Sequence, residues 1–427
     1  MLVGAQPDRG GLRRVTGLAR TTPGRLSLLA LLLVVVALLV GGLTAASVQR
    51  RSAALEALAD RSEPLAFAAQ EVYRAMADAD ATAAGAFLSG GVESAALRQR
   101  YEQDVAEAAA ALSAATAGAT RSPELTAALA TLSGRLPVYT GLVETARTHN
   151  RQGNPVGAAY LRQASHLMRS ELLPTARELY RVETGNVVRD LDRAGSLPWP
   201  ELLLGVAALV ALVLAQRWLT RRTNRVLNPG LVVATALSAV SLVWVPAAGL
   251  LAVHHSAASR DGAELVDVLA RARITTLTAR GDEMLTLVAR GSGADYENAF
   301  VDRDGQLADL LGQARQRSGA PPVVAALEHH ERWREVHRRV READDRGDYT
   351  TAVALALGHA EGGAATAFDA LDDALVEAIG VSRARLTDTI GRARGALGGA
   401  VPGVVLLALL TAVATTSGLW QRLKEYR

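Results

Sequence analysis

Two acidic residues on one predicted helix are the first candidates for chemistry. Asp78 and Asp80 flank Ala79 on the apolar seam of a helix expected over 49–89. A pair of carboxylates can exchange protons with a substrate when their environments differ. No nucleophile, histidine or glycine-rich loop accompanies this pair. We therefore favour ion pairs with arginines of neighbouring helices, and a ligand- or partner-binding role is the alternative.

Two arginines in the second half of the chain form another candidate site. Arg273 and Arg280 lie with Thr276 and Glu283 on one flank of a predicted helix, because the four recur at steps of three and four. Guanidinium groups bind carboxylates through paired hydrogen bonds, so this flank could hold a carboxylate ligand. A solvated helix face explains the same pattern and is the simpler interpretation.

The stretch most similar to a metal motif is Glu328-His329-His330-Glu331. A zinc-binding helix of this type needs two histidines four residues apart. Arg334 stands where the second histidine should be, and a guanidinium repels a cation. The chain has no cysteine, which excludes disulfides, thiol nucleophiles and thiolate ligands. We therefore expect no metal, no cofactor and no enzymatic activity.

Packed helices are expected to position these residues. The chain lacks the alternating β-branched pattern of strands, and its two large polar segments are rich in Ala, Leu, Arg and Glu, which favour helix. In the first segment, apolar residues recur at alternating steps of four and three, as in a bundled helix. Glycine and proline breaks divide this segment into four helices, at about 49–89, 92–119, 123–150 and 155–195.

The second segment repeats this plan. Its breaks fall at residues 291–293, 318–322 and 346–348. We infer a tandem duplication of two antiparallel four-helix bundles, in which the first and third turns of each bundle form the far tips. Arg151, Asn154 and Asp348 lie at such tips, and each is a candidate for binding a ligand or partner. The sequence leaves open whether the two bundles pack together.

Four apolar runs are long enough to cross a bilayer as helices, since a span needs about 20 residues. The pieces between and beside them are basic, and basic pieces stay in the cytoplasm. We therefore expect an all-α, multi-pass protein of the cell membrane with both termini cytoplasmic. In order, the expected segments are a cytoplasmic N-terminus (1–25), a first span (26–48), an extracytoplasmic bundle (49–198), a second span (199–215), a cytoplasmic turn (216–229), a third span (230–253), a second extracytoplasmic bundle (254–398), a fourth span (399–420) and a cytoplasmic tail (421–427).

The central cytoplasmic turn carries four arginines and no acidic residue. Arg217, Arg221, Arg222 and Arg225 could dock a cytoplasmic partner and couple it to the spans. The alternative is that they only set the topology and contact anionic lipid.

Four glycines at steps of four run from the last outer helix into the last span. Gly391, Gly395, Gly399 and Gly403 predict a close helix crossing, because small residues let helices approach one another in lipid.

The architecture resembles two known groups of proteins. Each half resembles the four-helix-bundle sensor modules of chemoreceptors and sensor kinases. The whole is similar to the actinobacterial four-span membrane proteins of the protein kinase G amino-acid-sensing pathway, through Asp78-Ala79-Asp80-Ala81-Thr82, Arg100-Tyr101-x-x-Asp104 and Gly347-Asp348-Tyr349. That resemblance covers about residue 26 to the end. It implies an outer partner, a binding lipoprotein loaded with glutamate or aspartate, and an inner partner, a Ser/Thr protein kinase, but no position-by-position binding site.

The leading functional hypothesis is a membrane sensor that relays a signal to another protein. The alternative is a non-enzymatic transport-associated or envelope scaffold subunit. A homodimer is compatible with both hypotheses. The formal net charge of +3 is no sign of nucleic-acid binding, since the excess of basic over acidic residues lies in the cytoplasmic pieces and both outer segments contain more acidic than basic residues.

Overall fold

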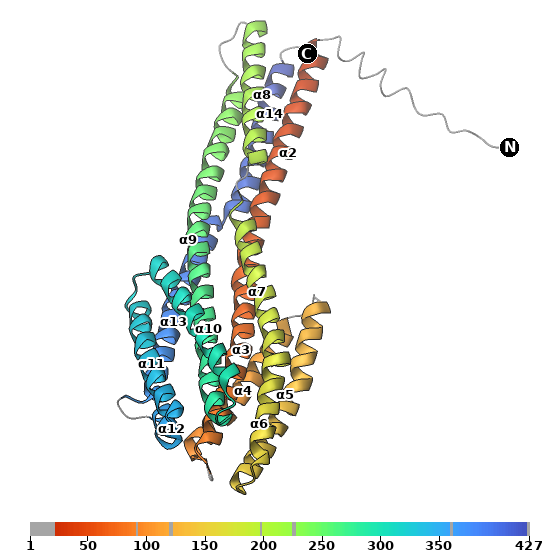
Figure 1. The fold of residues 1–427 in the computed structure, drawn as a ribbon. Coiled ribbons are helices and arrows are strands. Elements are labelled where there is room, and N and C mark those ends of the chain that lie inside the picture. Colours follow the sequence, from red (N-terminus) through yellow and green to blue (C-terminus); the bar gives the residue numbers. More distant parts are fainter. Residues whose placement is uncertain are drawn as a thin grey trace, which may run out of the picture. The chain divides into compact units, whose positions relative to one another are not determined.

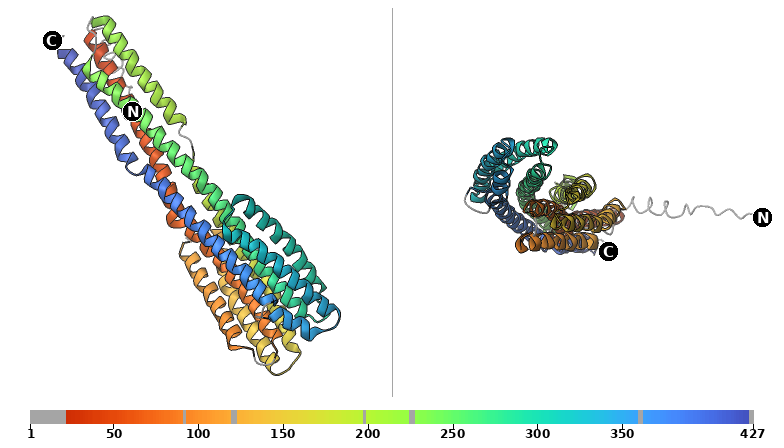
Figure 2. Two further views of the ribbon diagram at one scale, coloured as in Figure 1. Left: turned by 90° about the vertical axis from the view of Figure 1, so that its left-hand side faces the viewer. Right: turned by 60° about the horizontal axis from the view of Figure 1, so that its bottom comes forward.

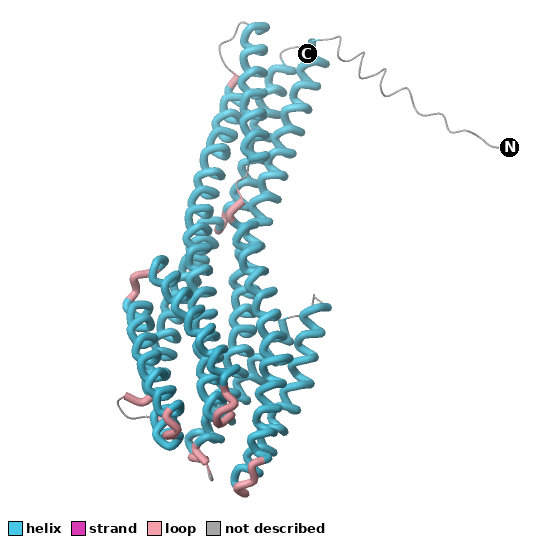
Figure 3. Tube along the Cα trace, viewed as in Figure 1, coloured by secondary structure: helices cyan, strands magenta, loops and turns pink. Residues whose placement is uncertain are grey.

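The computed structural model describes residues 22–90, 93–118, 123–196, 199–223, 228–358 and 362–424. Within these ranges every regular element is a helix (Figures 1 and 3), which confirms the expected all-α fold. In chain order the helices are α2 (Thr22–Ala57), the π-helix η1 (Leu58–Ser62), α3 (Glu63–Leu88), α4 (Ala95–Gly118), α5 (Pro123–Arg151), α6 (Val156–Leu167), the π-helix η2 (Met168–Leu172), α7 (Leu173–Ala194), α8 (Trp199–Thr223), α9 (Pro229–Val288), α10 (Ala294–Arg317), α11 (Pro321–Asp345), α12 (Tyr349–Leu357), α13 (Ala364–Leu397) and α14 (Ala400–Lys424).

Four helical stretches are long and apolar enough to cross a membrane. They are Gly24–Leu88, Val156–Arg221, Pro229–Ala247 and Ala364–Gln421. In the first stretch only 11% of the most apolar window is buried, so most of its apolar side chains point away from the protein. Outward apolar faces of this length fit a lipid environment. The chain is therefore a multi-pass membrane protein.

The chain divides into two compact units. The span unit comprises the described parts of Met1–Leu55, Asp192–Ala257 and Gly391–Arg427. The bundle unit comprises those of Glu56–Leu191 and Ala258–Ile390, and thus contains both halves of the proposed duplication. Helix α9 belongs in part to each unit, because it is unbroken from Pro229 to Val288.

One apolar core runs through both halves of the bundle unit. It joins residues of the first half, such as Val72 and Met76, to residues of the second half, such as Leu277 and Leu285. Figure 2 shows the helices of this unit side by side in two views. The two bundles therefore pack together, which answers the question left open by the sequence.

Helices α3 and α9 are the buried centre of this unit. Every residue of α3 from Val72 to Ala86 is buried, and so is every residue of α9 from Thr276 to Val288. A helix in a single four-helix bundle keeps one face in solvent, so burial on all sides requires neighbours from the other half. Alanine fills many of the α3 positions, which allows this close approach. Any charged side chain in these stretches must find a partner, because a lone buried charge is costly.

The second half has a break that the sequence pattern did not predict. Helix α12 ends at Leu357 and α13 begins at Ala364. Gly358 is extended, and Gly362 has a φ of 90°, a conformation that residues with a Cβ rarely adopt. These glycines let the chain leave the helix where the first half continues through α6, η2 and α7.

In the span unit, the four-glycine ladder does not form one seam. Gly391 and Gly395 face open space, and Gly399 has a φ of 76° in the break between α13 and α14. Only Gly403 lies against a neighbouring helix, at Trp244. The steps of four would place all four glycines on one face of a continuous helix. The left-handed conformation of Gly399 interrupts that helix, so Gly391 and Gly395 do not share the contact that Gly403 makes.

Other glycines make the close crossings instead. Gly41 of α2 lies against Ala408 of α14, and Gly230 of α9 lies against Gly418 of α14. Asn228 Nδ2 donates to the Gly418 carbonyl over 2.8 Å at the second crossing. Small residues and side-chain hydrogen bonds are the two means by which helices associate in lipid.

Candidate functional site

The candidate site is the set of charged residues that α3 and α9 bury between the two halves of the bundle unit. Asp78 and Asp80 on α3 face different groups of partners, because neighbouring positions two apart lie on opposite sides of a helix. The site therefore has three parts: a cluster around Asp78, a chain of ion pairs from Asp80, and a cluster around Glu283.

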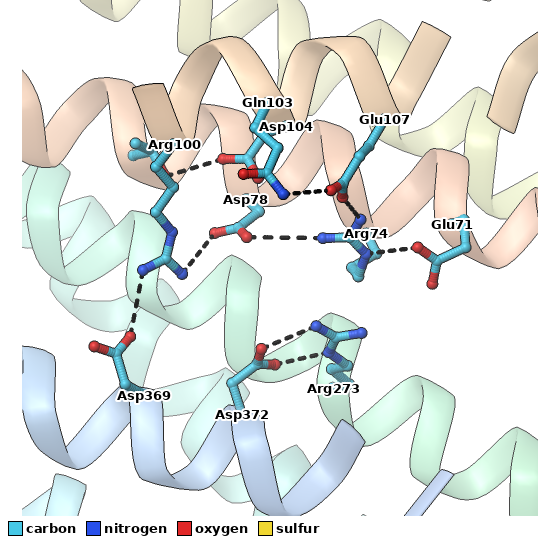
Figure 4. A network of polar contacts seen from close by, with 11 residues as sticks. Glu71, Arg74, Asp78, Arg100, Gln103, Asp104, Glu107, Arg273, Asp369 and Asp372 are labelled. Atoms are coloured by element: carbon cyan, nitrogen blue, oxygen red, sulfur yellow. Dashed lines mark hydrogen bonds and ion pairs between the residues drawn. The ribbon is translucent and has the colours of Figure 1, made fainter. Parts of the chain in front are cut away.

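Asp78 lies between two arginines (Figure 4). Arg74 Nη1 of the same helix is 3.8 Å from Asp78 Oδ2, and Arg100 Nη2 of α4 is 3.6 Å from Asp78 Oδ1. Arg74 is held in turn by Glu71, to which its Nε donates over 2.9 Å, and by Glu107. Burial raises the pKa of Asp78 above its usual range, and Arg100 is the strongest opposing influence.

Arg100 connects the two halves of the chain. Its Nη1 donates to Asp369 Oδ1 of α13 over 3.4 Å, while its Nη2 faces Asp78 of α3. To the right of Asp369 in Figure 4, Arg273 of α9 binds Asp372 of α13 through two hydrogen bonds of 2.7 and 2.9 Å. Arg100 therefore links a carboxylate of the first half to one of the second half.

Asp104 of α4 holds a proton near neutral pH. Its Oδ2 accepts from Thr82 Oγ1 over 3.2 Å. Burial, followed by repulsion from Asp78, raises the pKa of Asp104 to about 8. Two acids so close together cannot both ionise easily. Burial thus raises the pKa of both acids, so a change in the geometry of the cluster would change its protonation.

Asp80 begins a chain of ion pairs that crosses between the halves. Its Oδ1 accepts from Ser165 Oγ over 2.8 Å, and its Oδ2 is 3.6 Å from Arg169 Nε. Arg169 also binds Asp282 of α9, which in turn binds Arg303 of α10. Burial raises the pKa of both Asp80 and Asp282, and Arg169 opposes the shift at each.

Arg169 lies on the π-helix η2, where one turn of helix is widened. Such bulges are frequent at functional sites because they redirect a side chain and can move along the helix. From this position Arg169 forms ion pairs with both central helices, at Asp80 of α3 and Asp282 of α9.

Glu283 is the centre of the third part. It accepts from His337 Nδ1 over 2.9 Å and binds Arg280, whose Nη2 also donates to the Ala356 carbonyl over 2.9 Å. Arg280, His337 and their hydrogen bonds outweigh burial and lower the pKa of Glu283. Burial lowers the pKa of His337, but hydrogen bonds to Glu283 and Glu297 outweigh it and raise this pKa to about 9.

A cavity of about 70 Å³ lies where the Asp78 and Glu283 clusters approach each other. Its charged lining consists of Asp78, Arg100, Arg280 and Asp369, two acids and two bases from both halves. Phe368 supplies an apolar wall. Groups of both signs beside an apolar surface match a small zwitterion better than a metal ion or a nucleic acid.

The structure places the residues expected from the sequence in two classes. Asp78, Asp80, Arg273 and Arg280 lie in the buried network described above. Arg280 and Glu283 form the ion pair that their spacing allowed, whereas Arg273 binds Asp372 of α13. The flank predicted as a carboxylate clamp thus already holds carboxylates of the protein itself.

The tip residues lie outside this network. Asn154 Oδ1 accepts from the Val156 amide over 3.2 Å, and Asp348 caps α12 by accepting from the Thr351 amide over 3.1 Å. Arg151 is exposed at the end of α5. Asn154 and Asp348 therefore have local structural roles, which leaves partner binding at the tips as a hypothesis.

The central basic turn is described only in part. Arg217 and Arg221 are exposed on the last turns of α8. The Arg222 side chain and Arg225 lie outside the described part of the chain.

The sequence analysis missed Arg169, Asp282 and His337 as members of the site. Nothing in the local pattern around Arg169 distinguishes it from the many other arginines of the chain. Asp282 sits next to Glu283 on a predicted helix, and an acidic pair in an apolar helix was the one available signal.

Comparison with known proteins shows similarity to a sensor family over part of the chain. Residues 54–192, which contain α3 to α6 and most of α7, match a family model described as an actinobacterial sensor domain. No curated protein matches the chain, and no solved structure matches it. The first half of the bundle unit is therefore similar to the sensor domains of actinobacteria.

Proposed function

We propose that this protein is a transmembrane sensor that acts without catalysis. The bundle unit receives a signal outside the membrane, and the spans relay it to a protein in the cytoplasm. The observation that carries this proposal is the buried ion network between the halves, on helices that belong to spans. Helix α9 runs unbroken from the apolar Pro229–Ala247 stretch to Val288, past Arg273, Arg280 and Asp282. The similarity of residues 54–192 to a sensor domain supports the same role.

In this proposal the ion network allows two arrangements of the halves with similar free energies. Buried ion pairs contribute little net stability, because desolvation offsets their attraction, but breaking one leaves an uncompensated charge. Arg100 and Arg169 each face carboxylates of both halves, so two arrangements of the halves can both keep the charges paired. A ligand that binds one arrangement more tightly shifts the balance toward it.

The proposed input is an amino acid or an amino-acid-loaded binding protein. The cavity at Asp78, Arg100, Arg280 and Asp369 offers acids for an ammonium group and guanidinium groups for a carboxylate. A ligand there would compete with the Arg100 pairs and so alter the contact between halves. A loaded binding lipoprotein at the tips near Arg151 and Asp348 would act on the same contact from outside.

The proposed output is a Ser/Thr protein kinase or another cytoplasmic partner. Exposed Arg217 and Arg221 at the end of α8 could bind an acidic surface of such a partner. We place both termini and the central turn in the cytoplasm, since these pieces are basic.

Crosslinking from native membranes tests the proposal. A photoreactive residue replaces Arg151 or Arg346 in the outer turns, and another replaces Arg221. Capture of a solute-binding lipoprotein outside and a protein kinase inside is the expected result. Capture of a transport ATPase inside would favour the transport-associated alternative, and capture of only a second copy would favour a scaffold.

A further inference from the structure

The span unit contains a cavity that the sensor proposal does not use. It has a volume of about 80 Å³ and lies among α2, α8, α9 and α14. Most of its lining is aliphatic, but every helix contributes a polar group. The polar lining residues are Thr44, Glu201, Ser238, Ser241 and Thr411.

These polar groups need hydrogen-bond partners at membrane depth. Thr44 is 9% exposed, and Thr411 donates its hydroxyl to the Leu407 carbonyl over 2.8 Å, which leaves its oxygen free to accept. Pro246 has no amide hydrogen, so the Leu242 carbonyl one turn earlier lacks its usual helical donor. Both Leu242 and Pro246 line the cavity. Lipid chains cannot satisfy such groups.

The two ends of the cavity differ. Leu33 and Leu212 line one end and belong to a buried apolar cluster that also includes Leu26, Leu219, Leu231 and Leu419. At the other end Glu201 lies 4.0 Å from Arg50, whose side chain is 75% exposed. The cavity is therefore closed by leucines at one end and bordered by an exposed ion pair at the other.

We propose that this cavity is a water-filled vestibule that enters the membrane from the Glu201 end and stops at the leucine cluster. Its volume holds several water molecules, since one needs about 10–15 Å³. Water there supplies partners to the hydroxyls and to the Leu242 carbonyl, and lets α9 bend at Pro246 without breaking a protein hydrogen bond. The inference concerns the span unit alone and does not rest on the proposed signalling function.

Cysteine accessibility tests the vestibule directly, because the natural chain contains no cysteine. The full chain with Ser241→Cys or Thr411→Cys is reconstituted into lipid vesicles and exposed to silver ions on both sides. The matched controls are Val243→Cys on α9 and Leu409→Cys on α14, since these residues are 71% and 51% exposed on the outside of the span unit. The readout is loss of maleimide labelling after denaturation.

Thiols in the vestibule should react about tenfold faster or more than the controls, because the reactive thiolate forms only where water solvates it. Equal rates would overturn the proposal. A lipid chain in the cavity would give this second result, since it excludes water from the lining.

A blocking substitution provides an independent measurement. Adding Ser238→Leu to the Ser241→Cys variant should fill the cavity and slow the silver reaction toward the control rate. The same substitution added to the Val243→Cys variant should change nothing. A Ser241→Cys rate that is unaffected by Ser238→Leu would show that silver arrives by another route and would contradict the vestibule.

Discussion

At the scale of single residues, the site depends on charges that are buried but paired. Arg169 and Arg100 each bridge carboxylates of both halves, and Asp104 and His337 each hold a proton in the folded chain. Removing Arg169 is costly, because the side chains of Asp80 and Asp282 are buried and cannot reach water. Arg100 and Asp369 have side chains that are 41% and 39% exposed, so breaking their pair costs less. The protonation of these groups should therefore appear as a dependence of stability on pH.

The raised pKa of His337 predicts a loss of stability in alkali. In the folded chain this pKa is about 9, above the usual value of 6.5, so the stabilisation is complete below about pH 6.5 and is lost as pH rises to about 9. The loss should be on the order of 3 kcal/mol. Thermal unfolding of the purified chain, followed by circular dichroism, measures it. His337→Gln should flatten this part of the profile, and His166→Gln, at an exposed position of α6, should not. An unchanged profile for His337→Gln would show that His337 does not cause the loss of stability in alkali.

The raised pKa of Asp104 also predicts that stability falls as pH rises, but over a lower pH range than for His337. Its pKa is raised to about 8 in the folded chain, so the folded state binds the extra proton and loses stability as pH rises from about 4 to about 8. Asp104→Asn imitates the protonated acid and should be more stable than the natural chain at about pH 9, by on the order of 1 kcal/mol or more. Asp309→Asn on the exposed face of α10 is the matched control. Equal stability of the Asp104→Asn variant and the natural chain at that pH would show that Asp104 is ionised at no cost.

At the scale of elements, α3 and α9 explain why the site lies where it does. Each is the first helix of its half, each has a stretch that is buried on all sides, and each carries charges of the network. The aliphatic and alanine positions of α3 make room for α9 and α13 of the other half. The small side chains of α3 should therefore be intolerant of added volume.

A volume increase at Ala84 tests this packing. Ala84 is 0% exposed, so Ala84→Leu should lower stability by about 1–3 kcal/mol through overpacking. Ala109→Leu at an exposed position of α4 should stay within about 0.5 kcal/mol of the natural chain. Denaturant unfolding of both variants gives the comparison. Similar values for the two would mean that the outer face of α3 is open and that the halves do not share a core.

At the scale of the whole molecule, the sequence predicted the helices and spans but not how the halves pack. Apolar runs and seam periodicity follow from local composition, and the structure confirms the all-α fold and four candidate spans. Asp78 and Asp80 could be predicted as candidate site residues because acidic side chains on the apolar seam of a helix are unusual. Their cross-half partners, Asp369 through Arg100 and Asp282 through Arg169, depend on contacts between segments far apart in the chain. The four glycines at steps of four do not form one crossing, because Gly399 adopts a left-handed conformation. A spacing of four residues gives no sign of that conformation.

The central claim is that the Arg169 bridge couples the halves to the cytoplasmic side. Photocrosslinking at Arg221 in native membranes, compared between the natural chain and Arg169→Lys, tests it most directly. Lysine keeps the charge but cannot bind Asp80 and Asp282 together as a planar guanidinium does. If the bridge couples the halves to the cytoplasmic side, Arg169→Lys should leave the membrane level equal and change the yield of the cytoplasmic partner. Arg181→Lys should change neither, because Arg181 is an exposed arginine of α7 that pairs with Glu178 of the same helix. An unchanged yield in the Arg169→Lys variant would contradict the relay and leave the bridge with a purely structural role.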